Sequence, residues 1–121
     1  MSNAWQSYPG APVPGTRICH LDDVADAGLL PVEIGGFGLL VLRQARDVHA
    51  FVNACPHQYL PLDYRSGSIL SADGARLICS NHEANFDAVT GEGLGGLVQG
   101  CNLDMVPVTL DRNDDILVGE T

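Results

Sequence analysis

The sequence predicts an all-β domain of antiparallel strands, and three observations support this. Glycine and proline, with 14 and 7 of the 121 residues, together make up about 17% of the chain, against a usual share of about 12%. They are spread along the whole chain. Between them stand short runs rich in β-branched and apolar side chains. Two boxes that mix cysteine and histidine lie beside such runs, as loops at strand ends would. A chain of this length forms one domain with a modest core and has no room for a separate catalytic domain.

The N-terminal half is expected to hold short strands behind an irregular arm, residues 1–15. This arm has three prolines and two glycines after Trp5, and Ser2-Asn3-Ala4 has the character of a cloning remnant. The predicted strands are 17–21, 30–34, 37–43 and 48–53, with turns at 22–28 and 45–47. The stretch 42–52 contains no glycine or proline, so it also fits a helix. The pattern alone leaves both readings open.

In the C-terminal half the predicted strands are 68–71, 75–78, 105–110 and 116–118, with turns at 72–74 and 111–115. The turn Ala72-Asp73-Gly74 would close a hairpin that delivers Cys79 at a strand end. Five glycines lie between Gly91 and Gly100, and they suit a loop packed closely against the two boxes.

The composition excludes several classes of function. All six basic residues are arginines, so Schiff-base and phosphate-loop lysine chemistry is absent. A formal net charge of −9 repels nucleic acid and anionic membrane surfaces and predicts protein partners with basic patches, although an acidic excess also fits a plain role in solubility. No run approaches the roughly eighteen apolar residues of a spanning helix, and the start does not read as a signal peptide. We therefore expect a cytoplasmic protein.

The two boxes are Cys55-Pro56-His57 and Cys79-Ser80-Asn81-His82. Each offers one thiolate and one imidazole, and a Rieske 2Fe-2S centre needs this mixture because two cysteines hold one iron and two histidines the other. Structural zinc sites also use cysteine and histidine, but usually as pairs of like residues. Lone cysteines are often only small buried apolar side chains. An iron–sulfur site is thus favoured over a structural zinc-binding interaction module or no metal at all.

Residues around the boxes extend the pattern. They comprise Gln58, Pro61-Leu62, Ala84, Phe86-Asp87, Thr90-Gly91 and Pro107-Val108. With the boxes, this run resembles the Rieske ferredoxin family, small carriers that feed electrons to oxygenases; the resemblance covers 54–119 well and 17–53 weakly. It implies one Rieske domain, 16–121, with a sandwich-like antiparallel base and a smaller cluster-binding subdomain at about 54–100 formed by two hairpin loops. It also favours the hairpin over the helix at 42–52, because the family places a strand directly before its first box.

The resemblance implies a 2Fe-2S cofactor and a role without catalysis. The implied ligands are Cys55, His57, Cys79 and His82, with the cysteines on the inner iron and the histidines on the outer iron. The cysteines and histidines left over are Cys19, Cys101, His20 and His49, expected to be free thiols and ordinary packing or surface histidines. The protein would carry single electrons from a reductase to a terminal oxygenase. The alternative within the family is the small subunit of a reductase complex of the nitrite-reductase type.

The resemblance also indicates a low reduction potential. High-potential relatives clamp their two boxes with a disulfide, and the matching positions here are Leu60 and Asn81. Those relatives place serine and tyrosine hydroxyls against the cluster sulfurs, where this chain has Ala84 and Phe86. Hydrogen bonds to sulfur stabilise the more negative, reduced state, so their loss lowers the potential. The negative charge of Glu83, beside His82, acts in the same direction.

Overall fold

Short antiparallel strands joined by tight turns make up most of the described chain, which confirms the predicted all-β class. The computed structural model describes residues 4–54, 62, 69–79, 85–94 and 101–119. Its elements are η1 (Ala4–Ser7), β1 (Arg17–His20), η2 (Leu21–Asp23), β2 (Gly28–Ile34), β3 (Phe37–Gln44), β4 (Asp47–Val52), β5 (Arg76–Ile78), β6 (Asn85–Asp87), β7 (Met105–Val106), β8 (Val108–Leu110) and β9 (Asp115–Val118). They belong to two compact units, residues 1–52 with 104–121 and residues 53–103.

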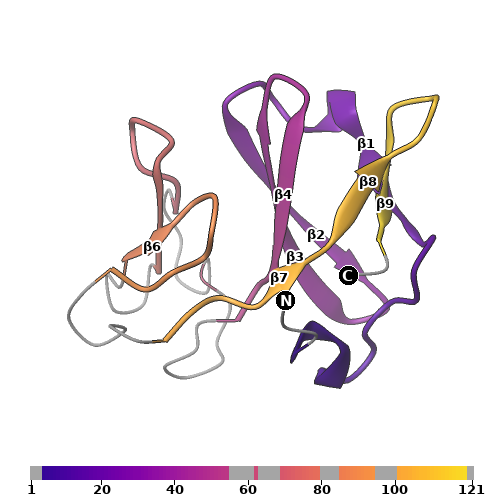
Figure 1. Ribbon diagram of the computed structural model, residues 1–121, viewed down its shortest axis with the longest axis horizontal. Coiled ribbons are helices and arrows are strands. Elements are labelled where there is room, and N and C mark those ends of the chain that lie inside the picture. The colour runs from indigo at the N-terminus through magenta and orange to yellow at the C-terminus, as the bar shows by residue number, and fades with distance from the viewer. Residues whose placement is uncertain (1–3, 55–61, 63–68, 80–84, 95–100, 120–121) are drawn as a thin grey trace. The chain divides into compact units, whose positions relative to one another are not determined.

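The larger sheet of the first unit has the strand order β2-β3-β4-β7, with every pair antiparallel (Figure 1). Gly35 and Gly36 join β2 to β3, and both have positive φ, which the favoured two-residue hairpin turns require. Ala45 and Arg46 join β3 to β4 where Gln44 pairs with Asp47. The predicted hairpin is therefore confirmed, and the alternative helix over 42–52 is wrong.

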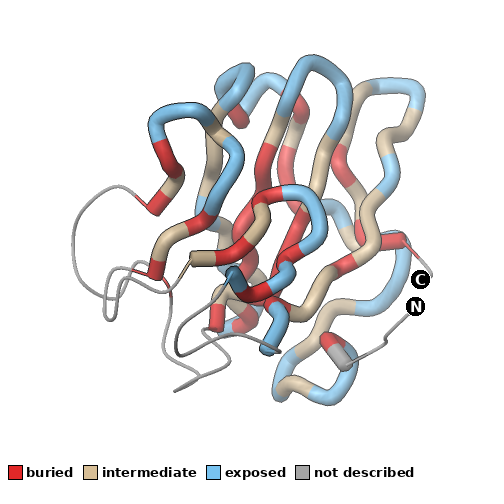
Figure 2. The backbone as a smooth tube through the Cα atoms, turned by 60° about the vertical axis from the view of Figure 1, so that its left-hand side comes forward, coloured by how far each residue is buried: buried red, intermediate tan, exposed pale blue. Residues whose placement is uncertain are grey.

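The core of this unit is centred on β3 and β4. Leu39, Leu40 and Val41 are fully buried in succession, and because neighbouring side chains of a strand point to opposite faces, both faces of β3 are covered. Ala50 and Phe51 are fully buried on β4. Figure 2 shows buried positions along the strands and exposed positions at the hairpin turns. β3 is thus paired with a strand on each side, β2 and β4. A helix over 42–52 would have removed the pairing with β4.

A second sheet of the same unit has the order β1-β9-β8. The predicted strand 105–110 is divided at Pro107: β7 pairs with β4 in the larger sheet, whereas β8 pairs with β9 in the smaller one. Proline has no N–H to donate to a ladder, so it suits the point at which a strand leaves one sheet for another. The Pro107 carbonyl accepts the Gly119 N–H at 2.8 Å, which ties this crossing to the end of β9.

The N-terminal arm packs onto the first unit. Trp5 lies in the short 3-10 turn η1 and is fully buried. The Tyr8 ring meets Phe37 edge to face with centroids 6.3 Å apart, and its hydroxyl donates to Asp104 Oδ2 at 2.7 Å. Asp104 is also the backbone acceptor for Val52, at 2.8 Å. The arm is irregular, yet two of its aromatic side chains contribute to packing.

The second unit is built on the antiparallel pair β5–β6, with Ile78 opposite Asn85. The predicted pairing of 68–71 with 75–78 is confirmed where it is described: Leu70 bridges Leu77, and the Ile78 N–H donates to the Ile69 carbonyl at 2.7 Å. Its buried apolar side chains are Ala54, Leu62, Ile69, Leu77, Cys79, Phe86, Ala88 and Leu103. A small separate core therefore surrounds the segments that flank both cysteine and histidine boxes.

Candidate metal centre

The second box lies in the connection between β5 and β6. Cys79 follows Ile78, the last residue of β5, and has no exposed surface. The pairing of Ile78 with Asn85 closes the hairpin at this end, so the connection that carries the box begins and ends on paired strands. Ser80, Asn81 and His82 lie outside the described residues, as do Glu83 and Ala84. Cys79 is therefore a buried free thiol on a well-supported strand end.

The opposite end of β5 is held by a network around Asp73. The Ser71 hydroxyl donates to Asp73 Oδ1 at 2.5 Å and accepts the Arg76 N–H at 3.0 Å. The Ala75 N–H also donates to Asp73 Oδ1. The hydrogen bond from Ser71 is the main reason why the pKa of Asp73 is lowered. Local hydrogen bonds in the turn before β5 thus fix where the strand starts. Because β5 has only three residues, they also fix the position of Cys79, which directly follows it.

The first box begins just after β4. Asn53 follows the last residue of that strand, and Ala54 is buried. Cys55 and His57 lie outside the described residues, as do Tyr59 and Leu60, and the chain is described again at Leu62, which is fully buried. The Asn53 side chain joins the residues before and after the first box, because its Oδ1 accepts the Leu62 N–H at 2.8 Å. The two flanks of the first box are therefore held together by a hydrogen bond.

Beyond β6, the chain turns back along that strand. Phe86 is fully buried and bridges Gly93, and the Leu94 N–H donates to the Asn85 carbonyl at 2.8 Å. Asp87 Oδ1 accepts the backbone N–H groups of Thr90 and Val89, at 3.0 and 2.8 Å, and these bonds lower the pKa of this carboxyl. The Asp87 carboxylate is thus engaged in its own turn. Of the predicted glycine loop, residues 95–100 lie outside the described residues.

The other cysteines and histidines lie in varied places. Cys19 is buried in β1, and burial raises the pKa of its thiol, with a further contribution from Asp23. Cys101 is exposed in the second unit. His49 lies half-buried on β4.

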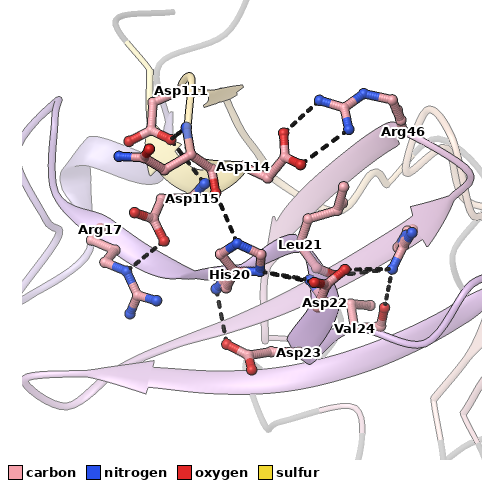
Figure 3. Close-up of polar contacts among 12 residues, drawn as sticks. Arg17, His20, Leu21, Asp22, Asp23, Val24, Arg46, Asp111, Asp114 and Asp115 are labelled. Atoms are coloured by element: carbon pink, nitrogen blue, oxygen red, sulfur yellow. Dashed lines mark hydrogen bonds and ion pairs between the residues drawn. The ribbon is translucent and has the colours of Figure 1, made fainter.

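Hydrogen bonds to the protein occupy both ring nitrogens of His20. Its Nδ1 accepts the Asp22 N–H at 3.0 Å, and its Nε2 lies 2.8 Å from the Asn113 carbonyl. Figure 3 shows His20 between Asp22 and the turn that holds Asp114. The His20 N–H donates to Asp23 Oδ2 at 2.9 Å, which completes a cap on η2. A metal ligand needs a free ring nitrogen, and both nitrogens of His20 are hydrogen-bonded to the protein, so His20 has a structural role.

The donors present fit an iron–sulfur group. Two thiolates and two imidazoles are the set that a Rieske centre takes, and buried Cys79 offers one thiolate on a rigid strand end. Within the described part of the chain, no three histidine, cysteine or acidic side chains gather as a metal site. Three of the four predicted ligands lie outside that part, so this finding concerns the rest of the molecule.

Asn53 is a residue that sequence reasoning treated only as the end of a strand. An asparagine directly before a loop is a signal that could have been used, since its short amide readily accepts a hydrogen bond from nearby backbone. The partner, nine residues away, was not evident from the pattern.

The family model of the Rieske 2Fe-2S domain matches residues 15–99. The chain belongs to this family, whose cofactor is a 2Fe-2S cluster. No curated protein matches the chain by sequence. None of the helices in the described segments is long and apolar enough to cross a membrane.

Solved structures with the same fold include electron carriers and a reductase subunit. The ferredoxin of carbazole 1,9a-dioxygenase from Nocardioides aromaticivorans IC177 is 23% identical with a TM-score of 0.72, covering 90% of this chain and 100% of the ferredoxin. A ferredoxin in complex with the oxygenase of carbazole 1,9a-dioxygenase is 22% identical with a TM-score of 0.67, covering 87% and 93%. A small subunit of an NADPH nitrite reductase is 19% identical with a TM-score of 0.63, covering 88% and 100%. At these identities the likeness concerns the fold.

Proposed function

We propose that this protein is a one-electron carrier that accepts electrons from a reductase and passes them to a terminal oxygenase, and that it transforms no substrate itself. The observation that carries the proposal is the buried thiol of Cys79 at the closed end of β5–β6, within a match to the Rieske domain that spans both boxes. The likeness in fold to ferredoxins of oxygenase systems supports the choice of acceptor.

The proposed ligands are Cys55, His57, Cys79 and His82. The two cysteines would hold one iron and the two histidines the other, and the imidazoles would provide the exit for the electron. When bound, a cluster of this type takes up and releases one electron. The chain's own part is to bury the thiolate side and to hold both ligand segments on short, paired or hydrogen-bonded flanks.

The metal assignment is tested by composition and spectroscopy. The purified protein is expected to be red-brown, with two irons and two acid-labile sulfides per chain and broad visible absorption. Cys79→Ser should abolish this spectrum, whereas the double variant Cys19→Ser with Cys101→Ser should keep it. A colourless protein that contains zinc would establish the structural zinc-binding alternative instead.

The acceptor is tested by reconstitution. Purified protein, a ferredoxin reductase and a Rieske oxygenase should together consume NADH and oxygenate an aromatic substrate, and omission of this protein should stop both. The likeness to a nitrite reductase small subunit favours a second candidate function. Stable co-purification with a large reductase subunit, and no turnover as a free carrier, would support that candidate and contradict the first. A cytoplasmic location is part of both proposals.

A further inference from the structure

The two boxes are held at their flanks in different ways. At the second box, backbone pairing of Ile78 with Asn85 joins the strands that enter and leave the connection. At the first box, the flanks are joined by a side chain, because Asn53 Oδ1 accepts the Leu62 N–H at 2.8 Å. This hydrogen bond encloses Cys55 and His57 in the sequence. One asparagine thus takes the place that a β-ladder has at the other box.

Both ends of this hydrogen bond are well anchored. Asn53 comes directly after β4 and belongs to the second unit, where the next residue, Ala54, is buried. Leu62 has no exposed surface and belongs to the core of the second unit. A bond between two anchored residues restricts the intervening segment more than a bond between mobile ones, since neither end can follow a displacement of the loop.

The chemistry of the Leu62 N–H adds a reason for an oxygen acceptor at this position. A backbone N–H in a buried residue must be hydrogen-bonded, and removal of its acceptor leaves the full cost of desolvation. Asparagine supplies this acceptor with a short side chain and without a charge. The resemblance implies that high-potential members of the family clamp the two boxes with a disulfide, at positions that are Leu60 and Asn81 here. Because these residues cannot form that disulfide, the hydrogen bond of Asn53 matters more for restraining the first loop.

We propose that Asn53 is a positioning residue of the cluster site: its side chain ties the two ends of the first ligand loop and thereby sets where Cys55 and His57 present their donor atoms. This inference rests on the proposed function, since it takes both residues as ligands. It assigns to Asn53 an effect on the electronic state and retention of the cluster, beyond a contribution to folding.

The experiment compares loaded wild-type protein with Asn53→Ala, Asn53→Asp and a matched control, Asn102→Ala. Asn102 Oδ1 accepts the Gly93 N–H, also across nine positions in the second unit, but the segment between them has no predicted ligand. The measurements are the electron paramagnetic resonance spectrum of the reduced protein, the reduction potential, the rate of iron loss to a chelator, and hydrogen exchange of the Leu62 N–H.

Asn53→Ala is expected to broaden and shift the resonance spectrum, move the potential, and lose iron about tenfold faster, the factor that corresponds to loss of a buried hydrogen bond of roughly 1.4 kcal/mol. Leu62 exchange should accelerate by a similar factor. Asn53→Asp keeps the oxygen acceptor, so its spectral line shape and Leu62 exchange should stay near those of the wild type. Asn102→Ala frees a segment that carries no predicted ligand, so it should change the spectrum, the potential and iron retention much less than Asn53→Ala does.

The proposal is overturned if Asn53→Ala keeps the wild-type spectrum, potential and iron retention, or if Asn102→Ala changes them as much. If Asn53→Ala fails to fold, Asn53→Asp decides: fast Leu62 exchange together with the wild-type spectrum, potential and iron retention would show that loss of the hydrogen bond leaves the cluster unaffected, and would overturn the proposal. Failure of the proposed function has a different signature. A wild-type protein that holds its cluster but exchanges no electrons with reductase or oxygenase would refute the carrier role and leave the role of Asn53 intact.

Discussion

A single histidine joins three segments of the first unit. His20 ends β1, caps η2 through its ring Nδ1 and reaches the 111–115 turn through Nε2 (Figure 3). These bonds require the proton of the neutral ring on Nε2, because Nδ1 acts as an acceptor. Histidine is an uncommon cap, and here the second bond explains why the larger ring suits the position better than a short hydroxyl.

Replacement of His20 should lower stability without affecting the cluster. His20→Ala removes the cap on η2 and the bond to Asn113, so we expect a loss of about 1–2 kcal/mol in the free energy of unfolding. His20→Asn restores an acceptor for the Asp22 N–H and should recover part of this loss. Urea unfolding followed by circular dichroism measures both, with His49→Ala on β4 as the control. Loss of iron from His20→Ala in the folded state would contradict its assignment as structural.

Asp87 should stabilise the protein in a manner that depends on pH. Hydrogen bonds from Thr90 and Val89 lower its folded pKa below the ordinary value of 3.8. The ionised carboxylate therefore contributes stability that is complete above the unfolded pKa and is lost as the pH falls through the folded pKa. Asp87→Asn keeps an oxygen acceptor but removes the charge. Its thermal midpoint should lie below that of the wild type at pH 7, and the difference should shrink as the pH falls below 3.8; equal midpoints at pH 7 would show that the charge has no effect.

Among the elements, the β3–β4 hairpin contains the clearest conformational cost. Ala45 has φ of 53°, a left-handed conformation that its Cβ disfavours, and the following Arg46 is not in that region. Two side chains hold the turn: the Ala45 N–H donates to Asp26 Oδ1 at 2.8 Å, and Arg43 Nε donates to the Ala45 carbonyl at 2.8 Å. The surrounding bonds thus maintain a backbone shape that glycine would adopt at lower cost.

Ala45→Gly should therefore raise stability. Relief of the left-handed conformation is worth about 1–2 kcal/mol, and the larger entropy of glycine in the unfolded chain offsets up to about 1 kcal/mol. We expect a net gain of roughly 0.5 kcal/mol, or about 2–3 °C in the thermal midpoint. Ala50→Gly is the matched control, because Ala50 is buried in β4 without positive φ and should lose stability. A lower midpoint for Ala45→Gly would show that Ala45 has packing contacts of greater value than the strain.

For the whole molecule, the first expectation concerns the reduction potential. The resemblance implies that the positions with a disulfide or hydroxyl donors in high-potential relatives correspond to Leu60, Asn81, Ala84 and Phe86, of which Phe86 is fully buried. With no hydroxyl at these positions to stabilise the reduced state, we predict a potential nearer about −150 than +300 mV. Protein-film voltammetry at neutral pH measures it. A value on the order of +250 mV would mean that other donors surround the cluster.

The second expectation concerns charge. In the described part of the first unit, Arg17 pairs with Asp115, Arg43 with Asp22 and Arg46 with Asp114. The full sequence has 15 acidic and 6 basic residues, so the chain has an acidic excess and a net charge of −9. Exposed pairs of this kind contribute little stability. The excess instead predicts attraction to basic surfaces on the reductase and the oxygenase, which acts mainly on the rate of encounter.

Salt should therefore slow electron transfer. The Debye length falls from roughly 30 Å at 0.01 M to 10 Å at 0.1 M, so the second-order rate of reduction by the reductase is expected to fall over this range. Stopped-flow absorbance at several salt concentrations measures it. A rate that stays constant or rises with salt would show that the acidic charge serves solubility alone.

Features that depend on neighbours along the chain could be predicted from the sequence. Alternation of apolar residues and the glycine and proline positions predicted strands and turns, including the hairpin before Asn53 and the strand that precedes Cys79. The spacing of the two boxes indicated the family, because ligand chemistry is specific to residue type and order. These signals are local, so they survive without knowledge of the fold.

Features that join distant residues are evident only in the folded chain. The predicted strand 105–110 divides at Pro107 because its first part pairs with β4 and its second part with β9, and Trp5 is buried because the rest of the fold provides a surface for it. Two side chains, Asp87 and Asn53, accept hydrogen bonds from the backbone N–H groups of Val89 and Leu62. These bonds depend on the path that the backbone takes after each acceptor. A hydrogen bond or a buried contact needs a partner placed within a few tenths of an ångström, and only the folded chain brings such partners together.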